Sequence, residues 1–116
     1  MNGEMYRVIR FEDVEWRRGH CGALKRLLSE DISFDFVRIE NAKKHFHKKT
    51  KEYYFIVWGE GEIELNDDVI KVKEGDLVVI EPGTLHRARG NMEVLVIGLP
   101  ALNESCLLYT SPSPRD

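Results

Sequence analysis

Short apolar stretches alternate with turn-forming residues through most of the chain. Between residues 6 and 99 these stretches are rich in β-branched and aromatic residues, and they end where Gly, Pro, Asn and Asp cluster. No long segment repeats with the 3.6-residue period of an amphipathic helix. The pattern therefore predicts an all-β fold, in which many short strands form a sandwich or a barrel.

The predicted strands, in chain order, are Tyr6–Phe11, Ala23–Leu28, Ile32–Ile39, Tyr53–Trp58, Glu62–Leu65, Val69–Val72, Leu77–Ile80, His86–Arg89 and Glu93–Leu99. Turn residues predict tight connections at Asn66–Asp68, Glu74–Asp76 and Pro82–Thr84. The second segment, ALKRLLS, also has residues that favour a helix, and so short a segment is not settled by periodicity.

Composition limits the classes of protein that the chain can belong to. Its 116 residues correspond to one domain, and 42% hydrophobic with 32% charged residues is typical of a soluble globular chain. No apolar run approaches the roughly 20 residues that span a bilayer, and the polar start lacks a secretory signal, so we expect no membrane partner and a cytoplasmic location. The two cysteines, Cys21 and Cys106, are too few for a disulfide framework, and their spacing is not that of a metal site.

Charge argues against a general affinity for nucleic acid. The net charge is −3, and the basic residues are interleaved with 20 acidic ones. Only HKKTK, residues 47–51, is locally basic. A nucleic-acid-binding loop there is a third interpretation of the chain, and a solvated loop explains the same residues more simply.

The last eleven residues differ abruptly from the β-rich pattern. CLLYTSPSPRD, from Cys106 to Asp116, resembles the translation of a transposase adapter used in preparing DNA sequencing libraries. We interpret it as adapter read-through, which makes Cys106 a foreign thiol and leaves the native C-terminus outside this chain. A genuine Ser/Pro-rich tail is the alternative. In both cases we expect a disordered tail without chemistry, because Pro112 and Pro114 cannot donate to a strand ladder.

Histidines and a glutamate mark the strongest candidate site. In an extended segment His45 and His47 lie on one face, since side chains alternate along a strand. Glu52 lies at the start of a strand that is apolar on both faces, so we expect both faces of this strand to be covered. A carboxylate buried there needs a partner, and a divalent cation is one such partner. His86 follows a turn and could face the pair in a barrel. By spacing alone, a polar strand edge explains these residues better than a metal site.

Other notable residues favour structural roles. Tyr54 and Trp58 are in phase with Glu52, but aromatic residues in strands more often belong to the core. We expect Arg26, Arg38 and Arg87 to lie on the surface. The alternating Glu60, Glu62 and Glu64 are most simply a solvated face of a strand. The spacing of His20 and Cys21 matches no recognisable site.

Two motifs resemble those of the cupin superfamily. The first runs His45, His47, four residues, Glu52, six residues, Gly59, and the second, GDLVVIEPGTLHRARG, starts at Gly75 with Gly83 and His86 in register. The chain departs from the family pattern at Ile39, where Gly is usual, at Glu81, in a Pro position, and at Gly90, in place of Asn. None of these departures removes a metal ligand.

The resemblance implies a cupin-like double-stranded β-helix, or jelly-roll barrel, over residues 22–100, after an N-terminal strand or extension at 1–21 and before a tail at 101–116. It implies one divalent metal ion, Fe, Mn, Ni or Zn, held by His45, His47, Glu52 and His86. The implied activity is metal-assisted isomerisation, epimerisation or oxygenation of a small polar or carbohydrate-like molecule. A non-catalytic ligand- or metal-binding module is the alternative, because no general base stands out beyond the ligand set. Small cupins commonly dimerise, so we also expect a homodimer.

Overall fold

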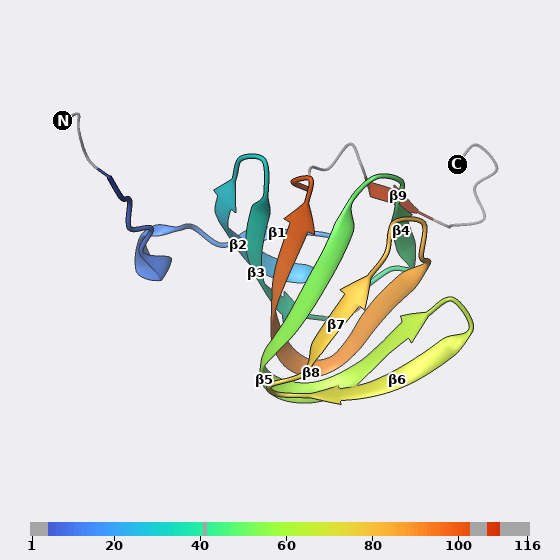
Figure 1. Cartoon of the computed structure of the whole chain (residues 1–116). Helices are drawn as coiled ribbons and strands as arrows, with labels where there is room; N and C mark the ends of the chain where they lie inside the picture. The colour runs from blue at the N-terminus through green and yellow to red at the C-terminus, as the bar shows by residue number, and fades with distance from the viewer. Residues whose placement is uncertain (1–4, 41, 103–106, 110–116) are drawn as a thin grey trace.

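The computed structural model describes residues 5–40, 42–102 and 107–109 (Figure 1). These residues form a short 3₁₀ turn, η1, and nine strands but no α-helix, which confirms the all-β prediction. The elements are η1 Phe11–Asp13, β1 Arg17–Arg18, β2 Gly22–Ser29, β3 Ser33–Ile39, β4 His45–His47, β5 Lys51–Leu65, β6 Asp68–Lys73, β7 Leu77–Ile80, β8 His86–Leu99 and β9 Leu107–Tyr109. ALKRLLS is thus a strand, β2. In the described part of the chain, no helix has the length and apolar character needed to cross a membrane.

The long antiparallel pair of β5 and β8 organises the molecule. It runs from Lys51 opposite Leu99 to Leu65 opposite His86. On its other side β8 pairs with β3, which continues to β2 and β1, and the start of β8 pairs with β4. β5 in turn pairs with β7 near its start and with β6 near its end.

The resulting sheet is curled and stays open. Among the described strands the pairings branch from β5 and β8 and never return to close a ring, so the predicted jelly-roll barrel is open rather than closed. Figure 1 shows the long strands curving, with β6 and β7 on one side and β2 and β3 on the other. The curvature, rather than ring closure, encloses the interior.

The sequence predicted two strands where the structure has the single strand β5, and two where it has β8. Each long strand is bent in the middle, and the bend lies where the sequence predicted a break. The β5–β8 register shifts between Ile56 and Trp58, as at a β-bulge, which bends a strand without ending it. Gly59 follows with φ of 86°, and a Cβ added there would lie 2.1 Å from the carbonyl oxygen of Asn91. Glycine lets the two strands remain paired through this close approach.

The hydrophobic core lies on the concave side of the sheet. Ile56 and Ile63 of β5 and Val94 of β8 are fully buried there, and Tyr54 and Met92 are 2% exposed. Side chains alternate between the two faces of a strand, so the residues next to these core residues point to the convex side. One side of the sheet therefore holds the core and the candidate site, and the other faces outward.

The two chain ends differ from the sequence predictions. Tyr6–Phe11 was predicted as a strand, but residues 6–10 have no regular structure and Phe11 begins η1, since no strand lies beside them to pair with. The predicted disorder of the tail is wrong for Leu107–Tyr109, which pair with β4 as β9. An extended apolar triplet can add to the open edge of β4 whatever its origin. The rest of the tail lies outside the described residues.

Candidate metal centre

Four side chains from three strands meet inside the curled sheet. β4 contributes His45 and His47, which point to one side of the strand while Phe46 points to the other. Glu52 lies near the start of β5, and His86 begins β8. The pairing of His45 with His86 across β4 and β8 joins segments that are far apart in the sequence. The fold thus brings together all four predicted side chains.

The cluster is compact and shielded from solvent. One ligand atom from each of the four residues lies within 4.8 Å of all the others. Nε2 of His86 is 2.8 Å and Nε2 of His47 is 3.5 Å from Oε1 of Glu52. Each of the four residues is at most 2% exposed. A carboxylate at this depth needs compensation by charge or hydrogen bonds.

Backbone carbonyls orient two of the histidines. Nδ1 of His45 donates to the carbonyl oxygen of Lys43 at 2.7 Å, and Nδ1 of His86 donates to that of Thr84 at 2.8 Å. A carbonyl oxygen only accepts hydrogen bonds, so the hydrogen lies on Nδ1 and a neutral ring carries its lone pair on Nε2. This arrangement is typical of metal-binding histidines.

The donor atoms fit a divalent cation. With its hydrogen on Nδ1, His86 directs a lone pair from Nε2 at Oε1 of Glu52, which is also an acceptor. Neither of these buried atoms has another hydrogen-bond partner among the described residues, so without an ion an added proton must lie between them. A cation bound by both atoms resolves this conflict. Three imidazole nitrogens and one carboxylate oxygen form a ligand set suited to transition metals.

The local electrostatics favour the protonation states that metal ligands need. Burial, assisted by the neighbouring His86, lowers the pKa of His45 to about 4. Burial alone would raise the pKa of Glu52, but the three nearby imidazoles, His86 foremost, outweigh it and hold that pKa below its ordinary value. At neutral pH His45 is therefore neutral and Glu52 is ionised. Metal binding requires these same states.

A cavity of about 90 Å³ lies against the cluster. Its lining includes His45, His47 and Glu52 together with the exposed Arg17 and His20, so the cavity connects the cluster with the surface. By this measure a single water needs about 10–15 Å³, so the space suits a small molecule rather than a polymer segment.

Cys21 and Tyr54 line the same cavity beside the cluster. Burial, aided by the charge of Glu52, raises the pKa of the Cys21 thiol to about 12, and burial raises the pKa of Tyr54 well above its ordinary value. The thiol and the phenol hydrogen-bond to each other. Both stay protonated at neutral pH, so they can hydrogen-bond to a ligand but do not supply a ready nucleophile or base.

Sequence reasoning missed part of this cavity. His20 and Cys21 matched no known spacing, because only the pairing of Gly22 on β2 with Ile39 on β3 brings their segment to the cavity. Arg26 was expected on the surface, yet it lines the cavity and forms hydrogen bonds of 2.8 and 2.9 Å to Asp35. Residues 26 and 35 are directly opposed across β2 and β3, a register that no linear motif reveals.

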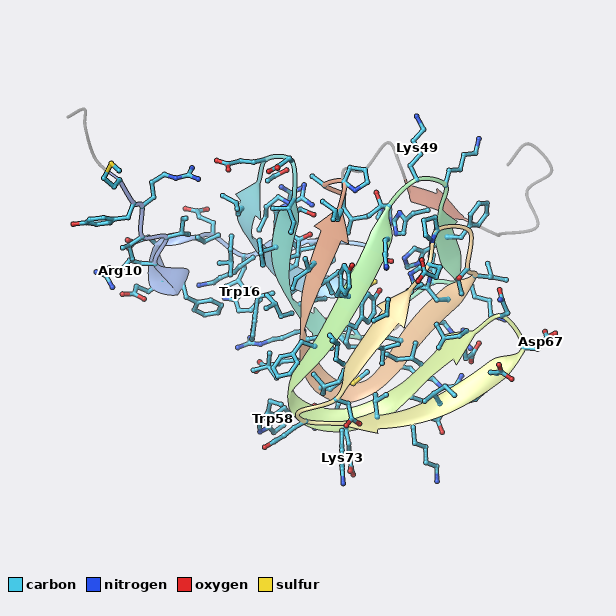
Figure 2. The ribbon with its side chains drawn as sticks, viewed as in Figure 1. Arg10, Trp16, Lys49, Trp58, Asp67 and Lys73 are labelled. Atoms are coloured by element: carbon cyan, nitrogen blue, oxygen red, sulfur yellow. The ribbon has the colours of Figure 1, made fainter. Side chains whose placement is uncertain are left out.

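The other sequence candidates differ in where they lie. Tyr54 belongs to the core as predicted, although it also lines the cavity, whereas Trp58 is 50% exposed. Figure 2 shows Trp58 near Lys73, at the end of the sheet opposite Lys49. The predicted solvated face is wrong for Glu64, which is 8% exposed because cationic side chains enclose it: Arg87, Arg89 and Lys44.

Comparisons with known proteins agree with this geometry. Residues 37–98 match the family described as Cupin domain. A gentisate 1,2-dioxygenase from Haloferax sp. is 33% identical over 60 residues, which cover 52% of this chain and 16% of that enzyme. The match thus spans about a sixth of the relative's length.

Two solved structures share the fold at low identity. A single-residue variant of Streptomyces PAC13 with uridine is 22% identical, with 92% of each chain covered and a TM-score of 0.82. A second structure of Pac13 describes it as a nucleoside dehydratase. A protein from Planctomyces limnophilus is 21% identical over 90% of this chain and 97% of that one, with a TM-score of 0.83. With the family match covering more than half of its residues, the chain belongs to the cupin family.

Proposed function

We propose that the chain is a metal-dependent cupin enzyme that acts on a small polar or carbohydrate-like molecule. His45, His47, Glu52 and His86 hold one divalent metal ion, and the adjoining cavity receives the substrate. The observation that carries the proposal is the facing pair of buried acceptors, Nε2 of His86 and Oε1 of Glu52, which only a cation or an added proton can reconcile.

Four protein ligands leave coordination positions open on a transition metal. When bound there, the metal supplies Lewis-acid polarisation of a carbonyl or enolate oxygen, or a bound water of lowered pKa, and a redox metal also supports oxygen activation. The chain's own contribution is orientation. The carbonyl oxygens of Lys43 and Thr84 fix two imidazole rings, and the protonated Tyr54 and Cys21 offer hydrogen bonds to a ligand.

Two reaction classes fit this arrangement: oxygenation, and metal-assisted isomerisation or epimerisation. The dioxygenase activity of the Haloferax relative supports the first, and the nucleoside dehydratase activity of Pac13 supports a non-oxidative reaction. Tyr54 and Cys21, which line the cavity beside the cluster, stay protonated and are not ready bases. In both reaction classes, the metal would therefore supply the main activation of the substrate or of oxygen.

The first test is metal content. Elemental analysis of the purified protein, reconstituted separately with Fe(II), Mn(II), Ni(II) and Zn(II), is expected to find close to one ion per chain. His47→Ala and His86→Ala should each weaken binding more than about 100-fold, beyond the 10–100-fold loss seen when a supporting residue is changed.

Lys48→Ala is the matched control, because Lys48 is exposed beside His47 and should leave metal binding unchanged. Equal losses in all three variants would indicate a diffuse basic surface instead of a metal centre. No bound metal after reconstitution would contradict the proposal.

A second test separates an enzyme from a binding module. The metal-loaded protein is incubated with panels of small sugars, nucleosides and aromatic acids while oxygen consumption and product formation are followed. Oxygen consumption that His86→Ala abolishes supports oxygenation, and product formation without it supports isomerisation or epimerisation. Tight ligand binding with no turnover of any panel member would favour the non-catalytic module.

A further inference from the structure

An ion pair lies on the core side of β2 and β3, where apolar side chains would be expected. Every second residue of β3 is buried, and Asp35 is the charged member of this series: Ser33, Asp35, Val37 and Ile39. Arg26 of β2 is directly opposite Asp35 and donates to both of its carboxylate oxygens, at 2.8 and 2.9 Å. The side chains of Arg26 and Asp35 are 24% and 7% exposed, so the pair is largely withdrawn from solvent.

The register of the sheet connects this pair with the metal-ligand cluster. Asp35 is opposed to Val96 of β8, and Val96 is opposed to Tyr54 of β5. Tyr54 is two residues from Glu52 and therefore shares its face of the strand. Arg26, Asp35, Val96 and Tyr54 form one row across four strands, and all four line the same cavity as Glu52. The ion pair and the cluster thus face one space.

Stability alone does not account for an ion pair at this position. Replacing a buried ion pair with apolar residues of similar volume is often neutral or stabilising, because the loss of hydration offsets the attraction. Asp35 accepts from Nε and Nη2 of Arg26 and so fixes the plane of the guanidinium, which has five N–H donors in total. Oriented guanidinium groups are typical of sites that bind carboxylate or phosphate.

A second arginine lines the cavity from β1. Arg17 is paired with Leu24 of β2, and directly opposed residues of an antiparallel pair lie on the same face of a sheet. Leu24 lines the cavity, so Arg17 lies on the cavity side of the sheet as well. Arg17 is exposed, whereas Arg26 is partly buried. One guanidinium is therefore at the open end of the cavity, and the other is further inside.

The charges of the cavity lining favour an anionic ligand. The two arginines, Arg17 and Arg26, balance the two carboxylates, Asp35 and Glu52. A bound divalent ion therefore leaves the lining with an excess of two positive charges, with the histidines left out of the count. A partly enclosed space with an excess of one sign of charge attracts a ligand of the opposite sign.

We propose that the substrate is a small acid, whose carboxylate or phosphate group binds Arg17 and Arg26 and whose other end carries an oxygen that reaches the metal. The rest of the lining includes apolar side chains that suit a short carbon chain: Leu24, Val37, Val96 and Leu102. This inference rests on the proposed function, because the excess positive charge comes from the metal ion. It narrows the class of small polar molecules to those with an anionic group.

Two matched pairs of small ketones test the inference. Levulinate and levulinamide have the same carbon chain and ketone oxygen but differ in charge, and hydroxyacetone phosphate differs from hydroxyacetone by its phosphate group. Calorimetric titration of the metal-loaded protein should show that an anion binds about ten-fold more tightly than its neutral partner, or better. A preference in the first pair alone assigns a carboxylate, and a preference in the second pair alone assigns a phosphate.

Two variants test the assignment to the arginines. Arg26→Leu combined with Asp35→Leu removes both charges, so that no unpaired carboxylate stays buried, and should abolish the preference for the anion. Arg17→Gln should reduce the preference roughly three-fold, a smaller loss because Arg17 is exposed. Arg18→Gln is the matched control, since Arg18 lies outside the cavity lining, binds Glu40 at 2.6 Å and should leave the preference unchanged.

Metal content and urea unfolding, measured on every variant, show that each is loaded and folded. If the double variant does not fold, Arg17→Gln still decides the assignment. One metal ion per chain with equal binding of each anion and its neutral partner would overturn the inference and leave the proposed function intact. An undiminished preference in the variants would overturn it too, because the metal alone would then bind the anion. A protein that binds no metal contradicts the proposed function itself, and the inference with it.

Discussion

At the scale of single residues, the chemistry of the candidate centre follows from burial. His45 is 2% exposed, and its Nδ1 is held by the carbonyl oxygen of Lys43, so the ring is fixed in one orientation and stays neutral. Glu52 stays ionised in the same enclosed space. Neighbouring positions on the strands, such as Lys48 and Lys51, are more exposed and do not share this chemistry.

The lowered pKa of His45 predicts a pH dependence of stability in the metal-free protein. The pKa is about 4 in the folded chain and about 6.5 in an ordinary setting, so between these values the unfolded chain binds a proton that the folded chain does not. The free energy of unfolding should therefore be largest above pH 6.5 and fall as the pH is lowered toward 4.

Urea unfolding of the metal-free protein at several pH values between 7 and 4.5 measures this slope. His45→Asn removes the titrating ring and should flatten the slope relative to the wild type. Parallel curves for the two proteins would show that other groups cause the acid sensitivity.

At the scale of elements, β5 and β8 place the site and the core on one side of the sheet. Glu52 and His86 each lie at the start of a strand and so at opposite ends of the antiparallel β5–β8 ladder, where Glu52 pairs with Gly98 and His86 with Leu65. Pairing alone would leave them far apart. The bend at the bulge after Ile56 folds the long ladder over, and β4 then joins His45 to His86. The site thus depends on the bend.

Gly59→Ala is expected to destabilise the protein more than Gly75→Ala. Both glycines have positive φ, 86° and 94°, so both substitutions carry a similar backbone cost of about 1 kcal/mol or more. Only at Gly59 would the new Cβ collide with backbone, 2.1 Å from the carbonyl oxygen of Asn91, whereas nothing lies within 4 Å at Gly75.

Chemical denaturation of the two variants tests this difference, with Gly75→Ala as the control for backbone strain. Gly59→Ala should lose at least about 2 kcal/mol more, the size of an ordinary overpacking penalty. Equal losses would show that the strands at the bend can separate without cost.

At the scale of the whole molecule, one curled sheet provides two different surfaces. Its concave side holds the core, the metal-ligand cluster and the cavity, and its convex side exposes part of Phe55, Leu77 and Val79. The molecule is elongated, with extents of 50 × 33 × 23 Å, and Figure 1 shows residues 5–10, before η1, extending beyond the sheet.

Removal of Cys106–Asp116 is expected to have little effect on the molecule. The tail contributes β9, three residues at the outer edge of β4, and a ladder this short adds little independent stability. A chain that ends at Ser105 should keep its metal content and lose at most about 1 kcal/mol of unfolding free energy, as measured by thermal and urea unfolding.

The matched comparison replaces Leu107–Tyr109 with three glycines in the full-length chain, which removes the side chains but keeps the length. A loss of several kcal/mol in either protein would show that the segment is an integral strand. That result would contradict our interpretation of the segment as adapter read-through.

The sequence by itself determined the strand content, most turns and the four candidate ligands. Alternation placed His45 and His47 on one face, and Asn66 with φ of 55° occupies the predicted turn before β6. These features depend on neighbours a few residues apart, and such local preferences are visible in a linear pattern. The two cupin motifs added Glu52 and His86 because they record which distant positions meet in this family.

Only the tertiary structure decided which segments share the cavity and which face lacks a cover. Cys21 and the Arg26–Asp35 pair reach the cavity through the register of β2 on β3, and Glu64 is enclosed by cations from β8 and the segment before β4. The sequence predicted that both faces of the strand with Phe55 are covered, which is wrong for the convex face, because Phe55 and Val57 are 39% and 42% exposed. Contacts between distant segments depend on how the sheet pairs and bends, and a linear pattern does not encode this.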